Sequence, residues 1–488
     1  MLYENKKNYI GIFLFIVSIV LLGYLVFNKL SFILFTIDEY FTFTLINLPV
    51  SDMLTMTAND VHPPLYYLLV KFVLKLLNAV NFNGNVIYIL RLLSMLPFLI
   101  ILAISGTKIK KEYGWLVAGL TSFTLIAMSG FMYHYIVIRM YSWAILFSLL
   151  SFIYFKDILN KSDIKSWLLF SVFVILGAYT HYFAAITSFT LYFFLFVNFI
   201  KDKNLQEIKK LLLSGIFCII VYLPWLLVLI NQIKKVHNDY WIPQVTLQYL
   251  FDSIMYFALI TTSNTIITIL ALFALIIFYV LVIREFKTNP NIENHYILYG
   301  ILAFILTLVI TVVLSYVYKP ILRYRYLLPS IAIFWFAISI YTNKIDNKVI
   351  LGFVLSLILI LGCFGVISND DSFNHFYGEG IANENLFEEI NSDNATVFCI
   401  APYASIEFGT YLQTKDIYST SKMIYGVPIN HTKMNYVPLK KIDSLIDKNN
   451  GTIFIIKGKA TDFNLTNKTL EYRHSIAELD FYSVNKNI

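Results

Sequence analysis

The chain has 488 residues, of which 58% are hydrophobic and only 14% are charged, and its mean hydropathy is +0.69. Soluble domains carry about 25% charged residues, so this composition excludes an ordinary soluble domain and predicts a membrane protein with many spans. The net charge of +7 is modest, and the lysines and arginines lie mainly in short loops between apolar runs. Membrane topology explains that placement better than a nucleic-acid partner does.

The number of spans follows from the long apolar runs, because a spanning helix needs roughly 20 apolar residues. Such runs begin near residues 9, 88, 114, 140, 167, 182, 211, 254, 296, 325 and 347. The first run is too long for the apolar core of a signal peptide and ends without a small-residue cleavage site, so we expect it to be retained. The sequence thus predicts a mainly α-helical protein with about 11 spans.

A shorter apolar run over residues 65–80 carries Lys71 and Lys75 one helical turn apart. If this run lies in the membrane interface, every lysine-rich short loop falls on the side of the N-terminus, as the positive-inside rule requires. If it spans, the later lysine-rich loops fall on the opposite side. We therefore expect a juxtamembrane helix inside an outer loop of residues 36–87, with the N-terminus in the cytoplasm and the protein in the plasma membrane.

The composition changes sharply near residue 368. Polar residues become more frequent beyond this point, and β-rich runs such as 395–400 and 451–456 alternate with helix-like segments. The sequence therefore predicts two domains: a transmembrane bundle over residues 1–368 and a small extracytoplasmic α/β domain over residues 369–488.

An acidic pair, Asp38-Glu39, directly follows the first span. Carboxylates at the edge of the hydrocarbon lose hydration unless they face water or a partner, so such a pair is costly to place there. This cost favours a functional role for the pair. A partly desolvated carboxylate there could act as a general base on an acceptor hydroxyl. The alternative is a water-facing stop signal after the span.

Asp60 and His62 stand beside a pair of prolines, Pro63 and Pro64, near the end of the same loop. The prolines lack backbone donors and fix φ, so they would end an irregular segment and start a helix at Leu65. Turn chemistry explains the prolines, but it does not explain the acid and the histidine next to them.

These landmarks resemble a known family. They are the acidic pair, the segment Asp60-Val61-His62-Pro63-Pro64-Leu65-Tyr66-Tyr67, the run Arg91-Leu-Leu-Ser-Met-Leu-Pro, and the weaker landmarks Arg139-Met140-Tyr141-Ser142, Tyr179-Thr180-His181-Tyr182-Phe183 and Arg323-Tyr324-Arg325-Tyr326-Leu327-Leu328-Pro329. Over roughly residues 1–340 the chain is similar to the GT-C membrane glycosyltransferases, specifically the protein O-mannosyltransferase and aminoarabinose transferase group (glycosyltransferase family 39-like).

The resemblance implies an inverting transfer of a sugar from a polyprenyl-phosphate carrier to a protein, lipid or glycan acceptor on the outer face of the membrane. By motif position the base would be Asp38, assisted by Glu39, while Asp60 and His62 would shape the substrate site.

Arg323 and Arg325 stand at an outer membrane edge, where a lipid phosphate would lie. Their guanidinium groups suit phosphate oxygens. The alternative is interfacial anchoring, in which long cationic side chains reach up to the lipid headgroups.

Arg139, His181 and Tyr182 are further candidates for substrate binding. Many relatives place a carboxylate just ahead of the arginine, where this chain has Val137 and Ile138. That departure argues against a two-carboxylate metal site and leaves a divalent metal open as a cofactor. His181 could line a sugar pocket beside Tyr182, although a hydrogen-bonded interfacial histidine is the more common occurrence.

Two other classes of function stay open. A lipid or sugar transporter or flippase would also be apolar, but it should carry charged or broken helices at mid-membrane, and the spans here are nearly free of acids. A receptor or assembly factor fits the composition but leaves the acidic pair and the His-Pro-Pro segment unexplained.

Overall fold

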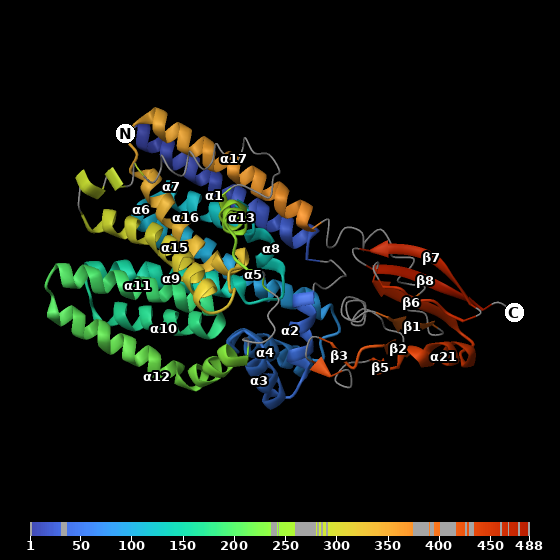
Figure 1. Cartoon of the computed structure of the whole chain (residues 1–488). Coiled ribbons are helices and arrows are strands. Elements are labelled where there is room, and N and C mark those ends of the chain that lie inside the picture. The colour runs from blue at the N-terminus through green and yellow to red at the C-terminus, as the bar shows by residue number, and fades with distance from the viewer. Residues whose placement is uncertain are drawn as a thin grey trace. The chain divides into compact units, whose positions relative to one another are not determined.

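The structure, a computed structural model, describes residues 2–30, 37–235, 242, 244–258, 280, 283–284, 286–288, 291–373, 390, 395–400, 416–424, 427–428, 434–458, 461–466, 468–476 and 479–486. The described residues fold into two compact units (Figure 1). We call them the helical unit, within residues 1–30, 57–70 and 81–370, and the sheet unit, within residues 31–56, 71–80 and 371–488.

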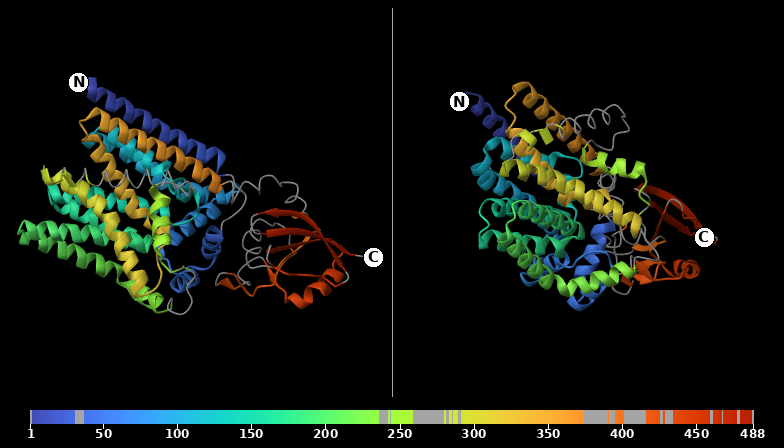
Figure 2. Two further views of the ribbon diagram at one scale, coloured as in Figure 1. Left: turned by 45° about the horizontal axis from the view of Figure 1, so that its top comes forward. Right: turned by 60° about the vertical axis from the view of Figure 1, so that its left-hand side comes forward.

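The helical unit contains most of the helices. They are α1 (Leu2–Asn28), α4 (Leu65–Ala79, which continues into the sheet unit), α5 (Val86–Ile104), the π-helix η1 (Ser105–Ile109), α6 (Lys110–Tyr113), α7 (Trp115–Ala127), α8 (Phe131–Ile136), α9 (Tyr141–Asn160), α10 (Ile164–Thr180), α11 (Tyr182–Lys201), α12 (Leu205–Lys235), α13 (Leu247–Ala258), α15 (Ile292–Val317), the 3-10 helix η2 (Tyr324–Leu327), α16 (Leu328–Asn343) and α17 (Lys348–Phe373). Helices α9 to α12 pack side by side (Figure 2).

The prediction of a multi-pass membrane protein is confirmed. Within the described ranges, eight helical segments are long and apolar enough to cross a membrane, and α7 and α10 are shorter apolar helices. Ten of the eleven predicted runs coincide with a helix. The remaining run, which begins near residue 254, lies largely outside the described residues.

Glycines allow close packing in this unit. A Cβ atom on Gly119 of α7 would lie only 2.0 Å from the carbonyl oxygen of Gly11 on α1. Small residues let helix backbones approach each other, which is how helices in lipid gain packing energy without a hydrophobic effect between them. The contact between α1 and α7 therefore depends on both glycines.

The sheet unit holds a six-stranded sheet of order β5-β2-β1-β6-β8-β7. Its elements are α2 (Ile37–Asn47), α3 (Val50–Asn59, which ends in the helical unit), β1 (Ala395–Cys399), β2 (Asp416–Ser419), β3 (Met423–Ile424), β4 (Val427–Pro428), β5 (Asn435–Tyr436), the 3-10 helix η5 (Leu439–Lys441), α21 (Ile442–Lys448), β6 (Thr452–Gly458), β7 (Lys468–Ile476) and β8 (Leu479–Lys486). Strands β3 and β4 form a separate pair. A small C-terminal α/β part was predicted, and its presence is confirmed.

The two β-rich runs expected from the sequence are β1 and β6, which pair in parallel with Val397 opposite Phe454. Strands β5, β2, β1 and β6 all run parallel, whereas β8 is antiparallel to both of its neighbours. In chain order the parallel strands are arranged 3-2-1-4, which is the order of one half of a doubly wound sheet.

Lys71 and Lys75 lie one helical turn apart on α4, but only Lys71 is buried. Its side chain is only 9% exposed, and its ammonium donates to the carbonyl oxygens of Ile46, at 2.8 Å, and Leu48. These carbonyls lie at the C-terminal end of α2, where the helix dipole favours a cation. Lys75, one turn later, is exposed. Lys71 thus fixes the end of the helix whose first turn carries Asp38.

Replacing Lys71 by methionine is expected to lower the free energy of unfolding by about 1–3 kcal/mol, because two carbonyl groups lose their donor. Thermal unfolding in detergent measures the change. The matched control is Lys75→Met, which removes an exposed lysine from the same helix and should leave the unfolding temperature nearly constant. Equal shifts in the two variants would show that the bonds to the end of α2 contribute nothing.

Candidate functional site

The irregular segment between α3 and α4 carries the first pair of candidate residues. His62 is 7% exposed, and its Nδ1 lies 2.8 Å from Oδ2 of Asp60. Pro63 and Pro64 are also buried, and α4 begins at Leu65 as predicted. An ionised carboxylate can only accept a hydrogen bond, so Nδ1 of His62 carries a proton and donates it to Asp60.

Arg139 joins this pair from the short connection between α8 and α9. Its side chain is 2% exposed. One terminal nitrogen donates to the hydroxyl of Tyr67 at 3.1 Å, and the other lies 3.4 Å from Nε2 of His62. A guanidinium group can only donate, so Nε2 of His62 accepts from it. Asp60, His62 and Arg139 therefore form one chain of hydrogen bonds.

The carboxyl of Asp60 is held in its ionised form. Burial raises its pKa, but the attraction of His62, the hydrogen bond from His62 and the attraction of Arg139 together outweigh burial and hold the pKa below its usual range. A carboxylate of lowered pKa stabilises the folded state above the pKa of the unfolded chain, and that stabilisation is lost as the pH falls through the folded pKa.

The variant Asp60→Asn is therefore expected to be less stable than the wild type at neutral pH by about 1.5–3 kcal/mol, the usual contribution of a hydrogen bond to a charged group. The difference should begin to shrink as the pH falls below about 4, where the carboxyl of the unfolded chain becomes protonated, and it should vanish once the pH has passed the lower pKa of the folded state. Thermal unfolding at a series of pH values checks this. Parallel pH curves for the two proteins would contradict the role assigned to the carboxylate.

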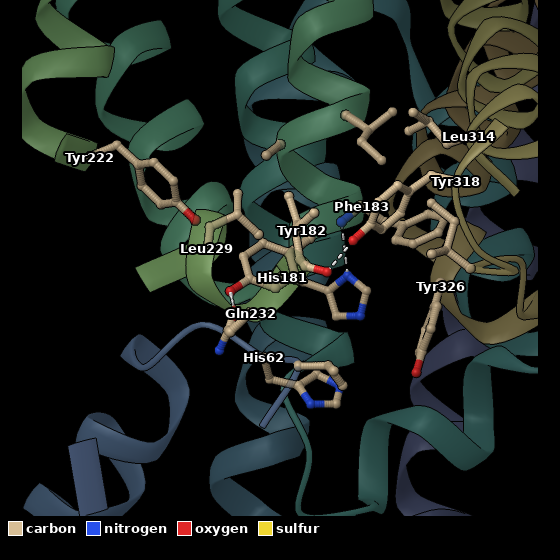
Figure 3. Close-up of a pocket in the computed structure, with 15 residues that line it drawn as sticks. His62, His181, Tyr182, Phe183, Tyr222, Leu229, Gln232, Leu314, Tyr318 and Tyr326 are labelled. Atoms are coloured by element: carbon tan, nitrogen blue, oxygen red, sulfur yellow. Dashed lines mark hydrogen bonds between the residues drawn. The ribbon is translucent and has the colours of Figure 1, made fainter. Parts of the chain in front are cut away.

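His181 occupies the break between α10 and α11. Its Nδ1 accepts a hydrogen bond from the backbone N–H of Phe183 at 3.1 Å, so the imidazole caps the start of α11 (Figure 3). Burial, followed by repulsion from His62, Arg139 and Arg325, drives the pKa of His181 well below its usual value. The ring is therefore neutral at pH 7, and its remaining proton lies on Nε2 as a donor.

Two tyrosine rings connect His181 to Arg325. The ring centroids of Tyr141 and Tyr326 lie 5.6 and 5.2 Å from that of His181. The guanidinium carbon of Arg325 lies 5.9 Å from the Tyr141 centroid and 5.8 Å from the Tyr326 centroid, within range of a cation–π interaction. We call Asp60, His62, Arg139, His181 and Arg325 the cationic cluster, because its two arginines outnumber its single carboxylate.

A cavity of about 490 Å³ adjoins this cluster (Figure 3). Its walls are mostly aliphatic and aromatic, and the residues are Val61, His62, His181, Tyr182, Phe183, Ala185, Ile186, Tyr222, Leu229, Gln232, Ile233, Leu314, Tyr318, Ile321 and Tyr326. The volume and the few polar groups are typical of a small-molecule site. Of the cluster, His62 and His181 line the cavity, so the apolar space reaches the two arginines through these imidazole rings.

Comparison with solved structures gives a match along the whole chain. The crystal structure of ArnT from Cupriavidus metallidurans bound to undecaprenyl phosphate matches with a TM-score of 0.59 and 9% sequence identity, over 99% of this chain and 98% of that one. The chain has the ArnT fold. The apo form of the same protein gives a TM-score of 0.45 and 12% identity, over 96% and 97% of the two chains. No protein-family model and no curated protein sequence matches the chain.

Within this ArnT fold, five of the nine candidate residues come together as the cationic cluster. Tyr182 lies close by on the cavity wall, where its hydroxyl donates to Gln232 and accepts from the indole N–H of Trp225 at 3.1 Å. Arg323 points elsewhere, since its guanidinium lies 3.4 Å from the hydroxyl of Tyr249 on α13. The two arginines of the Arg-Tyr-Arg-Tyr segment therefore have different partners.

Asp38 and Glu39 belong to the sheet unit, in the first turn of α2. Glu39 is fully buried and Asp38 is half-buried. Negative charge is favoured at this end of a helix, because the backbone N–H groups of the first turn point toward it. Their catalytic roles stay predictions.

Sequence reasoning missed several residues of the site. Tyr67, Tyr141 and Tyr326 lie inside the segments that carried the resemblance, but neither a motif nor a spacing shows which tyrosine points inward. Gln232 left a weaker signal as an uncharged polar residue near the end of a long apolar run.

A metal site would need several His, Cys, Asp or Glu side chains close together. In the part of the chain that the structure describes, no group of three or more His, Cys, Asp or Glu side chains is arranged to hold a metal ion.

Proposed function

We propose that the protein is a membrane glycosyltransferase that takes a sugar from a polyprenyl-phosphate carrier and transfers it to an acceptor on the outer face of the membrane. One observation carries the proposal: the cationic cluster adjoins the mostly apolar cavity of about 490 Å³. A polyprenyl-phosphate donor needs both features, since its phosphate requires cations and its tail requires apolar walls. The shared fold adds support, because ArnT was crystallised with undecaprenyl phosphate bound.

In this proposal the cluster stabilises the leaving phosphate. Arg139 and Arg325 supply fixed positive charge in a water-poor site, where electrostatic stabilisation of developing charge is most effective. The Nε2 proton of neutral His181 adds a hydrogen-bond donor that does not require ionisation. Phosphate is a good leaving group, so the cations replace a general acid.

Asp38 is the proposed general base, and Glu39 assists it. The acceptor oxygen forms a bond to the anomeric carbon while the bond from that carbon to the phosphate oxygen breaks. The acceptor proton passes to Asp38, and the polyprenyl phosphate leaves with the bonding electron pair. A single displacement of this kind inverts the anomeric centre.

The proposed topology follows the charges of the loops. It places the N-terminus in the cytoplasm and the C-terminal α/β domain, residues 369–488, outside the plasma membrane. The acceptor would then be met on the outer face, as protein, lipid or glycan.

Mass spectrometry of host cells with and without the chain tests the function. Cells without it are expected to accumulate a sugar-charged polyprenyl phosphate and to lose one sugar from an envelope component. Identical lipid-linked sugars and surface glycans in the two strains would contradict a transferase. Movement of the lipid-linked sugar across the membrane with no transferred product would instead favour a flippase.

A further inference from the structure

A second cleft, of about 570 Å³, lies within the sheet unit. One wall is the turn after β5, with Tyr436, Leu439 and Lys440, and the other is the segment after β6, with Asp462 and Asn464. Both walls follow the carboxyl end of a parallel strand. In open α/β sheets, ligands bind outside the carboxyl ends of the strands. The position of the cleft at the carboxyl ends of β5 and β6 therefore indicates a ligand site.

The two walls are held in place by their own contacts. The backbone N–H and the hydroxyl of Thr466 both donate to the carboxylate of Asp443, at 3.3 and 3.2 Å. Lys468 forms an ion pair with Asp447 at 2.9 Å. Phe463 is buried in the core that also contains Ile442 of α21. The cleft is therefore formed before any ligand arrives, which reduces the entropy lost on binding.

The charged groups that line the cleft are two carboxylates, of Asp443 and Asp462, and the ammonium of Lys440. Asp462, Asn464 and Lys440 are exposed, and among the described residues no hydrogen bond or ion pair engages their side chains. Tyr436 is 39% exposed, and the ammonium of Lys422 lies 5.4 Å from its ring centroid. Two carboxylates, of which that of Asp443 is engaged by Thr466, thus meet one amide, one ammonium and one tyrosine ring above a buried apolar floor.

This set of groups selects among ligand classes. A phosphate would need an excess of cations, and a lipid tail would need walls with few polar groups. A pyranose ring has an apolar C–H face, which suits the tyrosine ring, and a rim of hydroxyls that both donate and accept. Carboxylate, amide and ammonium groups satisfy such hydroxyls in both directions.

We propose that this cleft binds carbohydrate and holds sugar residues of the acceptor, so that the acceptor is a glycan. The carbohydrate-binding site is inferred from the cleft alone. The assignment of the acceptor as a glycan also rests on the proposed function.

Binding is measured on the full chain in lipid nanodiscs by saturation-transfer NMR, with short neutral oligosaccharides of glucose, mannose and galactose as probes. Tyr436→Ala and Asp462→Asn are each expected to raise the Kd of the bound oligosaccharide about tenfold, which corresponds to about 1.4 kcal/mol. The matched controls are Tyr472→Ala, which removes a tyrosine 56% exposed on β7, and Asp416→Asn, which changes an exposed acid on β2. Both controls should bind like the wild type.

Three results would overturn the binding site: no probe binds the wild type, both cleft variants bind normally, or the controls weaken binding as much as the cleft variants do.

A transfer assay separates this site from the proposed function. If Tyr436→Ala raises KM for a glycan acceptor without a matching fall in kcat, the acceptor assignment holds. If oligosaccharides bind the cleft but no sugar is ever transferred, the carbohydrate site stands and the transferase proposal fails. If transfer occurs with an unchanged KM, the acceptor assignment fails.

Discussion

Replacing Asp38 by asparagine is expected to lower kcat for sugar transfer by about 10²- to 10⁴-fold, the usual contribution of a general base. Asparagine keeps the size and hydrogen-bonding shape of the side chain but cannot take the acceptor proton. The position at the first turn of α2, half-buried and followed by the fully buried Glu39, suits a base that is shielded from bulk water.

The control for this substitution is Asp52→Asn. Asp52 is exposed and lies in the first turn of α3, so the variant makes the same chemical change at an equivalent helix position. It should transfer sugar at the wild-type rate. Asp38→Asn should also bind the donor as tightly as the wild type, because its defect lies in the chemical step. Undiminished transfer by a folded Asp38→Asn protein would remove Asp38 from the mechanism.

The second large effect concerns Arg139. Replacing it by methionine is expected to weaken the binding of undecaprenyl phosphate by at least about 2 kcal/mol, or roughly 30-fold in Kd, since a buried charge loses its partner. Arg139→Lys keeps the charge but loses the forked guanidinium that reaches both Tyr67 and His62. Its affinity for undecaprenyl phosphate should therefore lie between those of the wild type and Arg139→Met.

Two controls separate phosphate recognition from a general loss of structure. The alcohol undecaprenol has the same tail without the phosphate, and every folded variant should bind it equally well. Arg323→Met removes an arginine whose guanidinium lies beside Tyr249 on α13, and it should weaken phosphate binding much less than Arg139→Met. If Arg139→Met weakens the binding of undecaprenol and of undecaprenyl phosphate to the same extent, the cluster does not recognise phosphate.

The long apolar runs made the helical architecture predictable. A run of about 20 apolar residues has few alternatives to a spanning helix. Ten of the predicted runs are indeed helices, and eight of these are long enough to span. The start of α4 was also predictable, because two consecutive prolines leave little freedom at the preceding turn. The β-rich composition beyond residue 368 was enough to expect an α/β part, although not its strand order.

Side-chain direction could not be predicted in the same way. Arg323 and Arg325 are two residues apart, and only the fold decides that Arg325 meets Tyr141 whereas Arg323 meets Tyr249. The burial of Lys71 depends on where the end of α2 lies, which the sequence around Lys71 does not show. The start of α11 near residue 182 was predicted, but the capping role of His181 was not, because histidine seldom fills that position.

The most direct measurement is a transfer reaction with purified protein in nanodiscs. The donor is undecaprenyl phosphate carrying the sugar that accumulates in cells without the chain, and the acceptor is the envelope component that loses that sugar. We expect one undecaprenyl phosphate to be released for each sugar transferred, with NMR showing the inverted configuration at the anomeric carbon. Absence of product, or a product of retained configuration, would contradict the single displacement at the cationic cluster.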